Sequence, residues 1–518
     1  MTTTTISTVP PLRPPAPRPL PSPAPVPTLV EHGTRRVLIV TGVMLAALLQ
    51  MIDTTIVNVS LPTIQGNLGA TVDESIWIVT AFVVANVVVI PITPWLQRRL
   101  GRKRYFLISI AGFTLTSLLC GMATSLDALI VFRIAQGAFG GGLLSTAQIV
   151  MRDTFGPKQL GLSQSIFAFA TVLGPSVGPT LGGLITDNAS WPWIFDVNIV
   201  PGAIAFVLIW RLLRDDSVPS REPLDGIGLG LLIVALSTLQ YVLDQGQQYD
   251  WFSDPRIAGA AVASVASLAA FVVWELRQKA PIVDLRVLRH RAVLIAVLCI
   301  MANAIGVFGG ALLLPQFTVD GLGFTSTQTG ILVGLRALPV VLLTLWIGRL
   351  TNNQRIDLRV MIGLGLFTNG LGAIWLGRTI TTDSTFMTFV GPQLLAGLGI
   401  AFVYSPLLVA VLRAVPQEAA KASSFVILAF QMSGSITAAL LVTLLDRREV
   451  FHQAVLAAGA TLDRSAVAQF LHGHSLAQLA SIVDAQATTL AYDDVLLVAG
   501  TVVCALAPLV LLLPRKKS

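Results

Sequence analysis

The sequence predicts an all-α membrane protein with fourteen transmembrane helices. Hydrophobic residues make up 54% of the 518 residues and charged residues only 12%, about half the charged share of an average soluble protein. The mean hydropathy is +0.77. Apolar segments of roughly 18 to 25 residues recur along the chain, and a helix needs about 20 residues to cross the hydrocarbon core of a bilayer. These observations exclude a soluble fold.

The predicted helices follow one another from residue 37 to residue 513, and short polar loops join all but the last two. Their spans are 37–60, 75–96, 105–124, 127–149, 162–186, 194–213, 225–243, 257–275, 292–314, 329–348, 358–377, 385–411, 422–445 and 493–513.

The distribution of basic residues supports this number of helices, because Lys and Arg accumulate in cytoplasmic loops. With the N-terminus in the cytoplasm, 27 of the 34 Lys and Arg lie on the inner side, five lie outside, and Arg133 and Arg336 lie within spans. One helix more or fewer would remove this bias. The net charge of +7 is therefore interpreted as membrane topology and contact with anionic lipid, not nucleic-acid binding. We expect a multi-pass protein of the cell (inner) membrane with both termini in the cytoplasm.

The chain divides into five parts. A Pro-rich, disordered cytoplasmic tail (1–35) precedes a first six-helix bundle (36–214), and two inserted helices with their linkers (215–290) precede a second six-helix bundle (291–513) and a basic tail (514–518). The segment FRIAQGAFGG (132–141) resembles the region GPQLLAGLGI (391–400), and aligning Gly137 with Gly397 places Arg133 opposite Gln393. This internal similarity suggests that predicted helices 1–6 and 9–14 are two repeats.

Asp53 is the ionisable residue of the first predicted helix, more than two-thirds along it. An ionised group at the centre of a bilayer costs about 2.5–3.5 kcal/mol on insertion scales. Such a carboxylate suits a reversible proton carrier. The alternative is a structural Asp that Thr54, Thr55 or Asn58 caps.

Arg133 lies about a turn and a half into the fourth predicted helix. Lipid cannot accept its five hydrogen-bond donors, so the side chain must face the bundle interior or an aqueous cavity. It could modulate a nearby carboxylate, or it could form a fixed buried pair or extend to the interface.

Two motifs contain glycine, one in the loop between the second and third predicted helices and one in the fifth predicted helix. The loop RRLGRKR includes Arg99, Gly101, Arg102 and Lys103 at a tight turn. The motif GPSVGPTLGG places small residues at four-residue spacing on one helix face, where another helix can approach closely, and its prolines bend the helix. Its members are Gly174, Pro175, Gly178, Pro179, Gly182 and Gly183.

Polar and aromatic residues on apolar helices are candidate substrate contacts, although each could instead serve packing. They are Asn58, Gln164, Asn303, Phe308, Tyr404 and Gln431. Asp196 is either a second titrating group or a helix-end charge, and the sequence assigns no role to Arg336. The 446–492 segment is predicted to be a helix-rich external hairpin. It contains His472 and His474 but no third ligand at suitable spacing, so no metal site is predicted.

Enzymatic chemistry has little support in this sequence. The predicted spans contain no histidine, and an intramembrane enzyme would need a clustered nucleophile and base or a set of metal ligands. A passive channel has no proton coupling and would give a titratable Asp53 no role.

Taken together, the motifs resemble those of the major facilitator superfamily, and within it the fourteen-helix drug:proton antiporters of the EmrB/QacA type. DTTIVNVSLPTI (53–64) resembles the helix 1 motif, RRLGRKR the loop motif, RIAQG (133–137) the helix 4 motif and GPSVGPTLGG the antiporter motif of helix 5. WPWIFDVNIVPG (191–202) resembles the start of helix 6. The resemblance covers most of the chain after Arg36.

The resemblance implies two six-helix bundles, an inserted helix pair, and proton-coupled export of amphipathic drugs or toxic metabolites by alternating access. Asp53 would couple protons with Arg133, the loop 98–104 would gate the cytoplasmic side, and the glycine face of helix 5 would set the direction of export. The proton gradient would drive transport, so no cofactor is expected. In Gram-negative hosts such pumps often work with a periplasmic adaptor and an outer-membrane channel. Export of one dedicated metabolite, such as a natural product, fatty acid or siderophore, is the alternative.

The chain departs from the family pattern in two places. Where the loop motif usually begins with Gly and carries an Asp before its first Arg, this chain has Pro94 and Arg98. The charge pairing of that Asp with a neighbouring helix therefore cannot form. At the start of helix 6, Pro192 replaces the Arg of the common WRWIF sequence.

Overall fold

The computed structural model describes residues 30–214, 223–278, 281–353, 357–461, 464–472 and 474–513. Within them, fourteen helices are long and apolar enough to cross a membrane, which confirms the predicted all-α architecture. Nearly all of the predicted N-terminal tail, and the basic tail at 514–518, lie outside the described residues.

The first bundle contains six membrane-spanning units. They are α1 (Gly33–Leu68), α2 (Val72–Leu100), α3 (Arg102–Gly121), the pair α4 (Leu126–Gly140) and α5 (Leu143–Phe155), α6 (Leu160–Asn188), and the short α7 (Trp193–Asp196) with α8 (Ile199–Leu212).

The second bundle follows the inserted helices α9 (Gly226–Gln245) and α10 (Pro255–Arg277). Its helices are α11 (Arg291–Gln316), α12 (Ser326–Gly334) with α13 (Ala337–Asn352), α14 (Leu358–Gly377), α15 (Phe386–Ala414), α16 (Ala419–Gly459), α17 (Ser465–Leu471) and α18 (Leu476–Leu506).

Besides the sixth predicted span, which comprises α7 and α8, two predicted spans are each divided into two helices. The fourth is interrupted at Gly141 and Gly142, where the chain passes close to α2: a Cβ atom on Gly141 would lie 2.6 Å from the Asn86 carbonyl oxygen. The tenth is interrupted at Leu335 and Arg336, between α12 and α13. Pro339 explains the second break, because proline cannot donate the hydrogen bond that residue 335 would accept.

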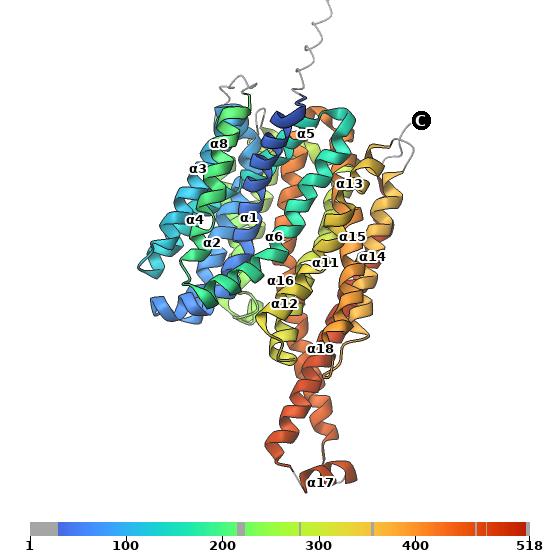
Figure 1. The fold of residues 1–518 in the computed structure, drawn as a ribbon. Coiled ribbons are helices and arrows are strands. Elements are labelled where there is room, and N and C mark those ends of the chain that lie inside the picture. Colours follow the sequence, from blue (N-terminus) through green and yellow to red (C-terminus); the bar gives the residue numbers. More distant parts are fainter. Residues whose placement is uncertain are drawn as a thin grey trace, which may run out of the picture.

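The 446–492 segment is rich in helix, as predicted, and it forms a hairpin that continues two transmembrane helices. α16 runs for 41 residues and α18 for 31, so both helices continue well beyond a bilayer's thickness. They project from one end of the molecule with α17 at the tip (Figure 1). Arg448 and His452 of α16 contact the Asp494 carboxylate of α18 and join the two helices.

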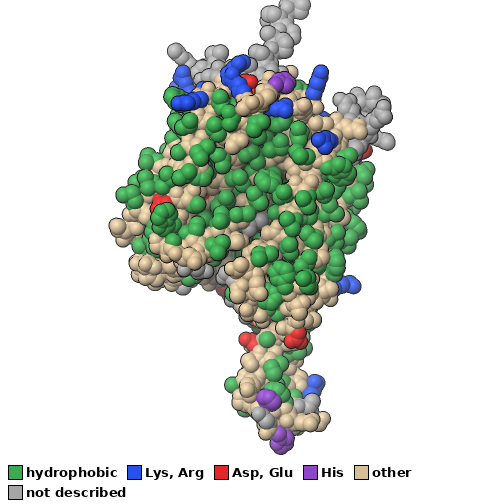
Figure 2. All heavy atoms as spheres, viewed as in Figure 1, with side chains coloured by type: hydrophobic (Ala, Val, Ile, Leu, Met, Phe, Trp, Pro, Cys, Tyr) green, Lys and Arg blue, Asp and Glu red, His purple; other side chains and the backbone are tan. Residues whose placement is uncertain are grey.

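The surface separates two ends of different chemistry. Hydrophobic side chains cover the body of the molecule, and Lys and Arg gather at the end opposite the hairpin (Figure 2). We call these the basic end and the hairpin end. The start of α1 lies at the basic end (Figure 1). A wide apolar belt with charge at its edge is the surface expected of a protein surrounded by lipid.

The two halves meet along α6, which packs on α12, α13 and α15, and along α2, which packs on α16. α9 lies against both α2 and α16. Near the basic end, Ser165 and Ser405 hydroxyls are 2.7 Å apart across this interface, and the Gly161 amide donates to Asn352 at 2.7 Å. The apolar residues Ile149 and Leu160 of the first half pack with Val409 and Leu412 of the second. The halves are therefore joined near the basic end.

Candidate functional site

Asp53 and Arg133 form a buried ion pair in the first half. The Arg133 Nη1 donates to Asp53 Oδ2 at 2.6 Å, and the two side chains are 1% and 0% exposed. Asp53 lies 15 residues before the end of the 36-residue α1. It is therefore close to the middle of the helix, because α1 continues eight residues past the predicted end. A pair removed from water in this way is strongly coupled electrostatically.

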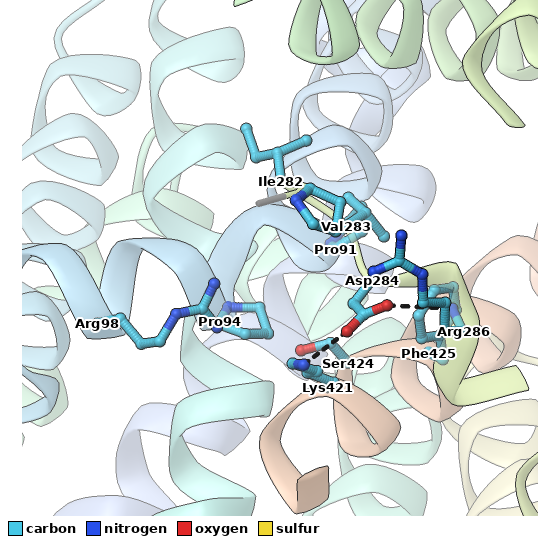
Figure 3. Close-up of a pocket in the computed structure, with 11 residues that line it drawn as sticks. Pro91, Pro94, Arg98, Ile282, Val283, Asp284, Arg286, Lys421, Ser424 and Phe425 are labelled. Carbon is cyan, nitrogen blue, oxygen red and sulfur yellow. Dashed lines mark hydrogen bonds and ion pairs between the residues drawn. The ribbon is translucent and has the colours of Figure 1, made fainter. Parts of the chain in front are cut away.

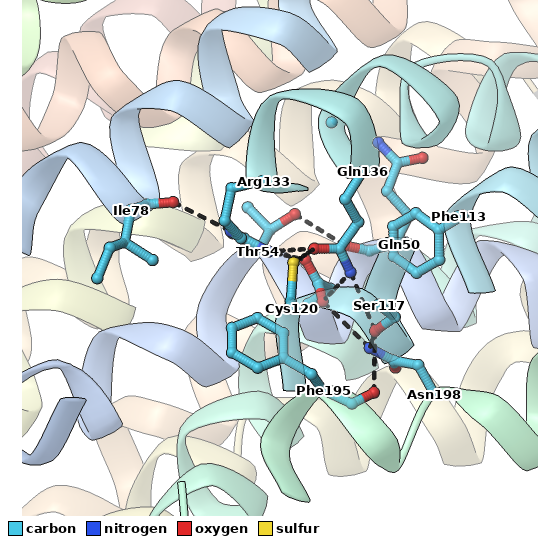
Figure 4. A network of polar contacts seen from close by, with 12 residues as sticks. Gln50, Thr54, Ile78, Phe113, Ser117, Cys120, Arg133, Gln136, Phe195 and Asn198 are labelled. Carbon is cyan, nitrogen blue, oxygen red and sulfur yellow. Dashed lines mark hydrogen bonds and ion pairs between the residues drawn. The ribbon is translucent and has the colours of Figure 1, made fainter. Parts of the chain in front are cut away.

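Two amide side chains complete the hydrogen bonding of Asp53. Gln136 Nε2 donates to Asp53 Oδ1 at 2.9 Å, and Asn198 Nδ2 donates to the same atom at 3.1 Å. Both amides also donate to Ser117 Oγ, which in turn donates to the Phe195 carbonyl oxygen. Figure 4 shows this network, to which α1, α3, α4 and α8 contribute. Gln136, Asn198 and Ser117 were not among the predicted site residues, although each is a polar residue in an apolar span.

The guanidinium of Arg133 is held from several sides. Its Nε donates to the Ile78 carbonyl oxygen at 3.0 Å and its Nη1 to Gln136 Oε1 at 2.8 Å. The Phe82 ring lies 4.0 Å below the guanidinium carbon, a cation–π contact. Arg133 therefore does not extend to the interface. Nor is Asp53 capped by its neighbours, since Thr54 donates to the Gln50 carbonyl oxygen instead.

The glycine face of the fifth predicted helix, now α6, packs directly on α1 beside Asp53. A Cβ atom on Gly174 would overlap Met51, one on Gly178 would overlap the Thr55 hydroxyl, and one on Gly182 would lie 2.5 Å from the Ile56 carbonyl oxygen. Gly183 is different, because its nearest neighbour would be Val59 Cγ1 at 3.7 Å. Pro175 and Pro179 lie within α6, as predicted. The glycines thus bring two backbones together at the level of the ion pair.

The basic loop joins α2 to α3 at the basic end. Gly101 has φ of 88°, a conformation that glycine adopts readily. Arg102 forms an ion pair with Asp153 at the end of α5, and with Lys103 it lines a small pocket formed by the first half. Arg99 is exposed. The loop is thus attached to its own half.

A pocket of about 280 Å³ lies beside this loop, where α2, the linker before α11 and α16 meet (Figure 3). Pro91, Pro94 and Arg98 of α2 form one wall. Across it, Lys421 Nζ of α16 donates to Asp284 Oδ2 of the linker at 2.7 Å. This ion pair joins the linker that follows the inserted helices to α16.

The pKa of Asp284 is lower than its ordinary value. Partial burial acts to raise this pKa, but the hydrogen bond and charge of Lys421, together with the Arg286 amide and charge, outweigh that effect. Asp284 is therefore ionised at neutral pH and holds Lys421.

Three of the six candidate substrate contacts lie close to one another at the interface between the halves. Phe308 and Tyr404 both pack on the Phe430 ring, with centroids 5.0 and 5.5 Å away. Gln431 Nε2 is 3.4 Å from Asn86 Oδ1 of α2, and Gln50 of α1 donates to the same oxygen at 3.1 Å. Phe430, Asn86 and Gln50 were not predicted.

The structure places the other three candidates elsewhere. Gln164 accepts a hydrogen bond from Gln148 within the first half, and Asn303 accepts one from Asn369 within the second. Asn58 is exposed on α1.

Metal ligation has no structural support among the described residues, where no group of three His, Cys, Asp or Glu side chains could hold an ion. His474 stacks on Phe470 near the tip of the hairpin. Cys120 and Cys299 are buried thiols.

Comparisons with known proteins agree with this architecture. The sequence model of the Major Facilitator Superfamily matches residues 43–439. The chain is 34% identical over 427 residues to the multidrug export protein EmrB of Haemophilus influenzae, covering 82% of this chain and 83% of the relative. It is 33% identical to Escherichia coli EmrB over the same shares. It is 34% identical to the fatty acid resistance protein FarB of Neisseria gonorrhoeae over 79% of this chain and 80% of that protein.

Two solved structures share the fold. The human organic anion transporter MFSD10 aligns with a TM-score of 0.57 at 16% identity, over 91% of this chain and all of that one. The proton:xylose symporter XylE aligns with a TM-score of 0.56 at 12% identity, over 90% and 95% of the two chains.

Proposed function

This chain belongs to the major facilitator superfamily, in its EmrB-type multidrug-export branch, and we propose that it exports amphipathic small molecules in exchange for protons. The observation that carries the proposal is the buried Asp53–Arg133 pair in the middle of α1. The named activities of the EmrB relatives support export as the direction. The fatty acid resistance of FarB supports the alternative of one dedicated substrate, which the panel below tests.

Protonation of Asp53 would change the packing of three helices. Three donors converge on the carboxylate, from Arg133 and Gln136 of α4 and Asn198 of α8. A protonated Asp53 carries no charge to hold Arg133, and its new O–H needs an acceptor where donors now point. Proton uptake therefore favours a shift of α1 relative to α4 and α8, and proton release favours the present arrangement.

α6 offers a path from this shift to the interface between the halves. It packs on α1 through Gly174, Gly178 and Gly182, and on the second half through Ser165 and α13. A displacement of α1 is thus transmitted through tightly packed backbone, which responds by discrete rearrangement and not by gradual deformation. This packing supports alternating access driven by the charge on Asp53.

The substrate region would lie between Phe430, Tyr404 and Phe308 of the second half and Gln50 and Asn86 of the first. Aromatic faces and amide groups suit compounds that are partly apolar and partly polar. Both halves contribute to the region, so their relative movement would expose it to either side.

The decisive experiment measures efflux of a fluorescent amphipathic cation from cells that express the protein, with and without a protonophore, and in parallel with the Asp53→Asn variant. We expect efflux that the protonophore stops and that the variant lacks. The amide retains an acceptor for Arg133, and Gln136 and Asn198 can turn their own amides, so the variant should still fold and insert. Asp383→Asn, a change at an exposed carboxylate in the loop after α14, should leave efflux unchanged.

Efflux that persists fully in Asp53→Asn would refute the coupling role of this carboxylate. If correctly inserted protein exports no compound of a broad panel, drug export is wrong. Activity toward one compound class would then identify a dedicated exporter.

The hairpin is proposed to bind a periplasmic adaptor that leads to an outer-membrane channel, with the basic end in the cytoplasm of a cell whose inner membrane holds the protein. Large apolar side chains on the hairpin support a partner, since Val450, Phe451 and Leu476 are 66%, 51% and 70% exposed. Removal of residues 457–478 should abolish cross-linking to the adaptor and leave insertion intact. Unchanged cross-linking would count against this role.

A further inference from the structure

The second half contains a buried guanidinium without a carboxylate beside it. Arg336 is 7% exposed and lies at the break between α12 and α13. No ion pair to it occurs among the side chains that the structure describes. An isolated charge in the bilayer interior costs several kcal/mol, and such residues normally have a partner.

Two hydrogen-bond donors at this break, one of Arg336 and one of Gln393, make no hydrogen bond to the described protein. Its Nε donates to Gln393 Oε1 and its Nη1 to the Gly306 carbonyl oxygen at 2.7 Å, which leaves Nη2. Gln393 Nε2 is buried and has no partner. The orientation of the Gln393 amide is determined by Arg336, because the arginine Nε can only donate and so must face the amide oxygen. Both remaining donors therefore need an acceptor.

The surrounding helices are shaped to hold the guanidinium in place. A Cβ atom on Gly310 of α11 would overlap its nitrogen atoms, and a Cβ atom on Gly397 of α15 would overlap the Arg336 backbone. The two glycines form a cradle that fixes the arginine between α11 and α15. The close packing at both glycines holds the Arg336 side chain in this position.

Small cavities adjoin the guanidinium inside the second bundle. One of about 20 Å³ is lined by Gly306, Gly310, Leu313, Asn369 and other mostly apolar residues, and a second of about 10 Å³ extends toward Phe317 and Tyr492. Arg336 is the one charged residue in the described lining of either cavity. Each has room for about one water-sized group, far less than a drug-sized ligand needs.

The first half contains a comparable buried guanidinium, which has a carboxylate beside it. If the two bundles are repeats, α11 corresponds to α1 and α15 to α4, and Gln393 aligns with Arg133. In the first half, Asp53 of α1 neutralises the guanidinium. In the second half, α11 presents Gly306 and Gly310 to a guanidinium that comes from the α12–α13 break. The negative charge that the chain supplies in one half is absent in the other.

We propose that Arg336 binds a small monovalent anion, a halide ion, in the cavity beside its guanidinium. Nη2 of Arg336 donates to the anion, which neutralises the guanidinium as Asp53 neutralises Arg133. The site is separate from the proton pair and from the substrate region, so it does not depend on the transported compound.

The test is thermal unfolding of the purified full chain in lipid nanodiscs at constant ionic strength. Sodium gluconate, whose anion is too large for the cavity, is the reference for sodium chloride and sodium bromide. An anion that binds only the folded protein raises the unfolding midpoint in a saturable way.

The variants separate the site from general charge effects. Arg336→Gln and Gly310→Ala should lose the anion-dependent rise or need at least about tenfold more anion to produce it. The alanine variant keeps the arginine but fills its cradle. Arg378→Gln removes an exposed arginine after α14 and should respond like the wild type.

Each outcome bears on the proposal. A saturable rise with chloride and bromide that both variants lack supports the site. No rise with either halide, or an equal rise in Gly310→Ala, overturns it. If Arg336→Gln does not fold, anomalous density from a bromide-soaked wild-type crystal is decisive: bromide beside Arg336 Nη2 supports the site, and bromide only elsewhere overturns it.

Discussion

Several buried polar contacts of the first half meet at Arg133. It touches Asp53, Gln136, the Ile78 carbonyl oxygen and the Phe82 ring. With no water to replace these contacts, removal of the guanidinium leaves a carboxylate buried and uncompensated. Its contribution to stability is therefore inseparable from the charge on Asp53.

Arg133→Gln should destabilise the protein by about 3–5 kcal/mol, the usual effect of removing one member of a buried pair. The double variant Asp53→Asn/Arg133→Gln should be more stable than Arg133→Gln alone, because it removes both charges. Denaturant unfolding of the purified variants in detergent measures both differences. A double variant no more stable than Arg133→Gln would contradict this account of the lost stability.

At the scale of elements, the contact between α1 and α6 depends on glycines at four-residue spacing. Gly178→Val should force the helices apart beside Asp53, because even a Cβ atom there would overlap the Thr55 hydroxyl. We expect loss of proton-driven transport in proteoliposomes and a lower unfolding temperature.

Gly183→Ala is the matched control for Gly178→Val. It lies on the same helix, and its Cβ atom would make only an ordinary contact of 3.7 Å with Val59. Equal transport by both variants would contradict the role of the glycine face.

The linker before α11 contributes an ion pair between Asp284 and Lys421 of α16. Because folding lowers the pKa of Asp284 from its ordinary value of 3.8, the pair contributes stability above that value. The contribution is lost as the pH falls through the lower pKa of the folded protein. Both side chains are partly exposed, at 16% and 29%, so we expect about 1 kcal/mol or less.

Asp284→Asn should remove this part of the pH dependence. The measurement compares unfolding midpoints of the variant and the wild type from about pH 3 to pH 7. The difference between them should be largest near neutral pH and should vanish in acid. Parallel curves over the whole range would show that the pair does not contribute.

At the scale of the whole molecule, contacts across the interface join the two halves near the basic end. Alternating access requires these contacts to break in each cycle. The Ser165 and Ser405 hydroxyls, 2.7 Å apart, provide a direct way to prevent this.

A Ser165→Cys/Ser405→Cys variant, in a background without Cys120, Cys299 and Cys504, should form a disulfide on mild oxidation. Transport should then stop and return on reduction, because the cross-link holds the basic end closed. Each single-cysteine variant should transport normally under both conditions. A cross-linked protein that still transports would show that this interface does not open.

The number and order of the membrane-spanning helices follow from the sequence alone. Apolar length depends only on local composition and the thickness of a bilayer, so the fourteen spans and a helical segment between the last two could be predicted. Helix ends were less accurate, because α1, α16 and α18 continue beyond the bilayer where hydropathy no longer marks them.

Which polar groups meet depends on how the helices pack. Side chains from α3, α4 and the start of α8 form one network with Asp53 of α1, and no spacing along one helix records such neighbours. The same holds for Asp284 beside Lys421, which are 137 residues apart in the chain. It holds equally for the absence of a described carboxylate near Arg336. Hydrophobic periodicity orients each helix toward or away from lipid, but the pairing of buried polar groups depends on how the helices pack in three dimensions.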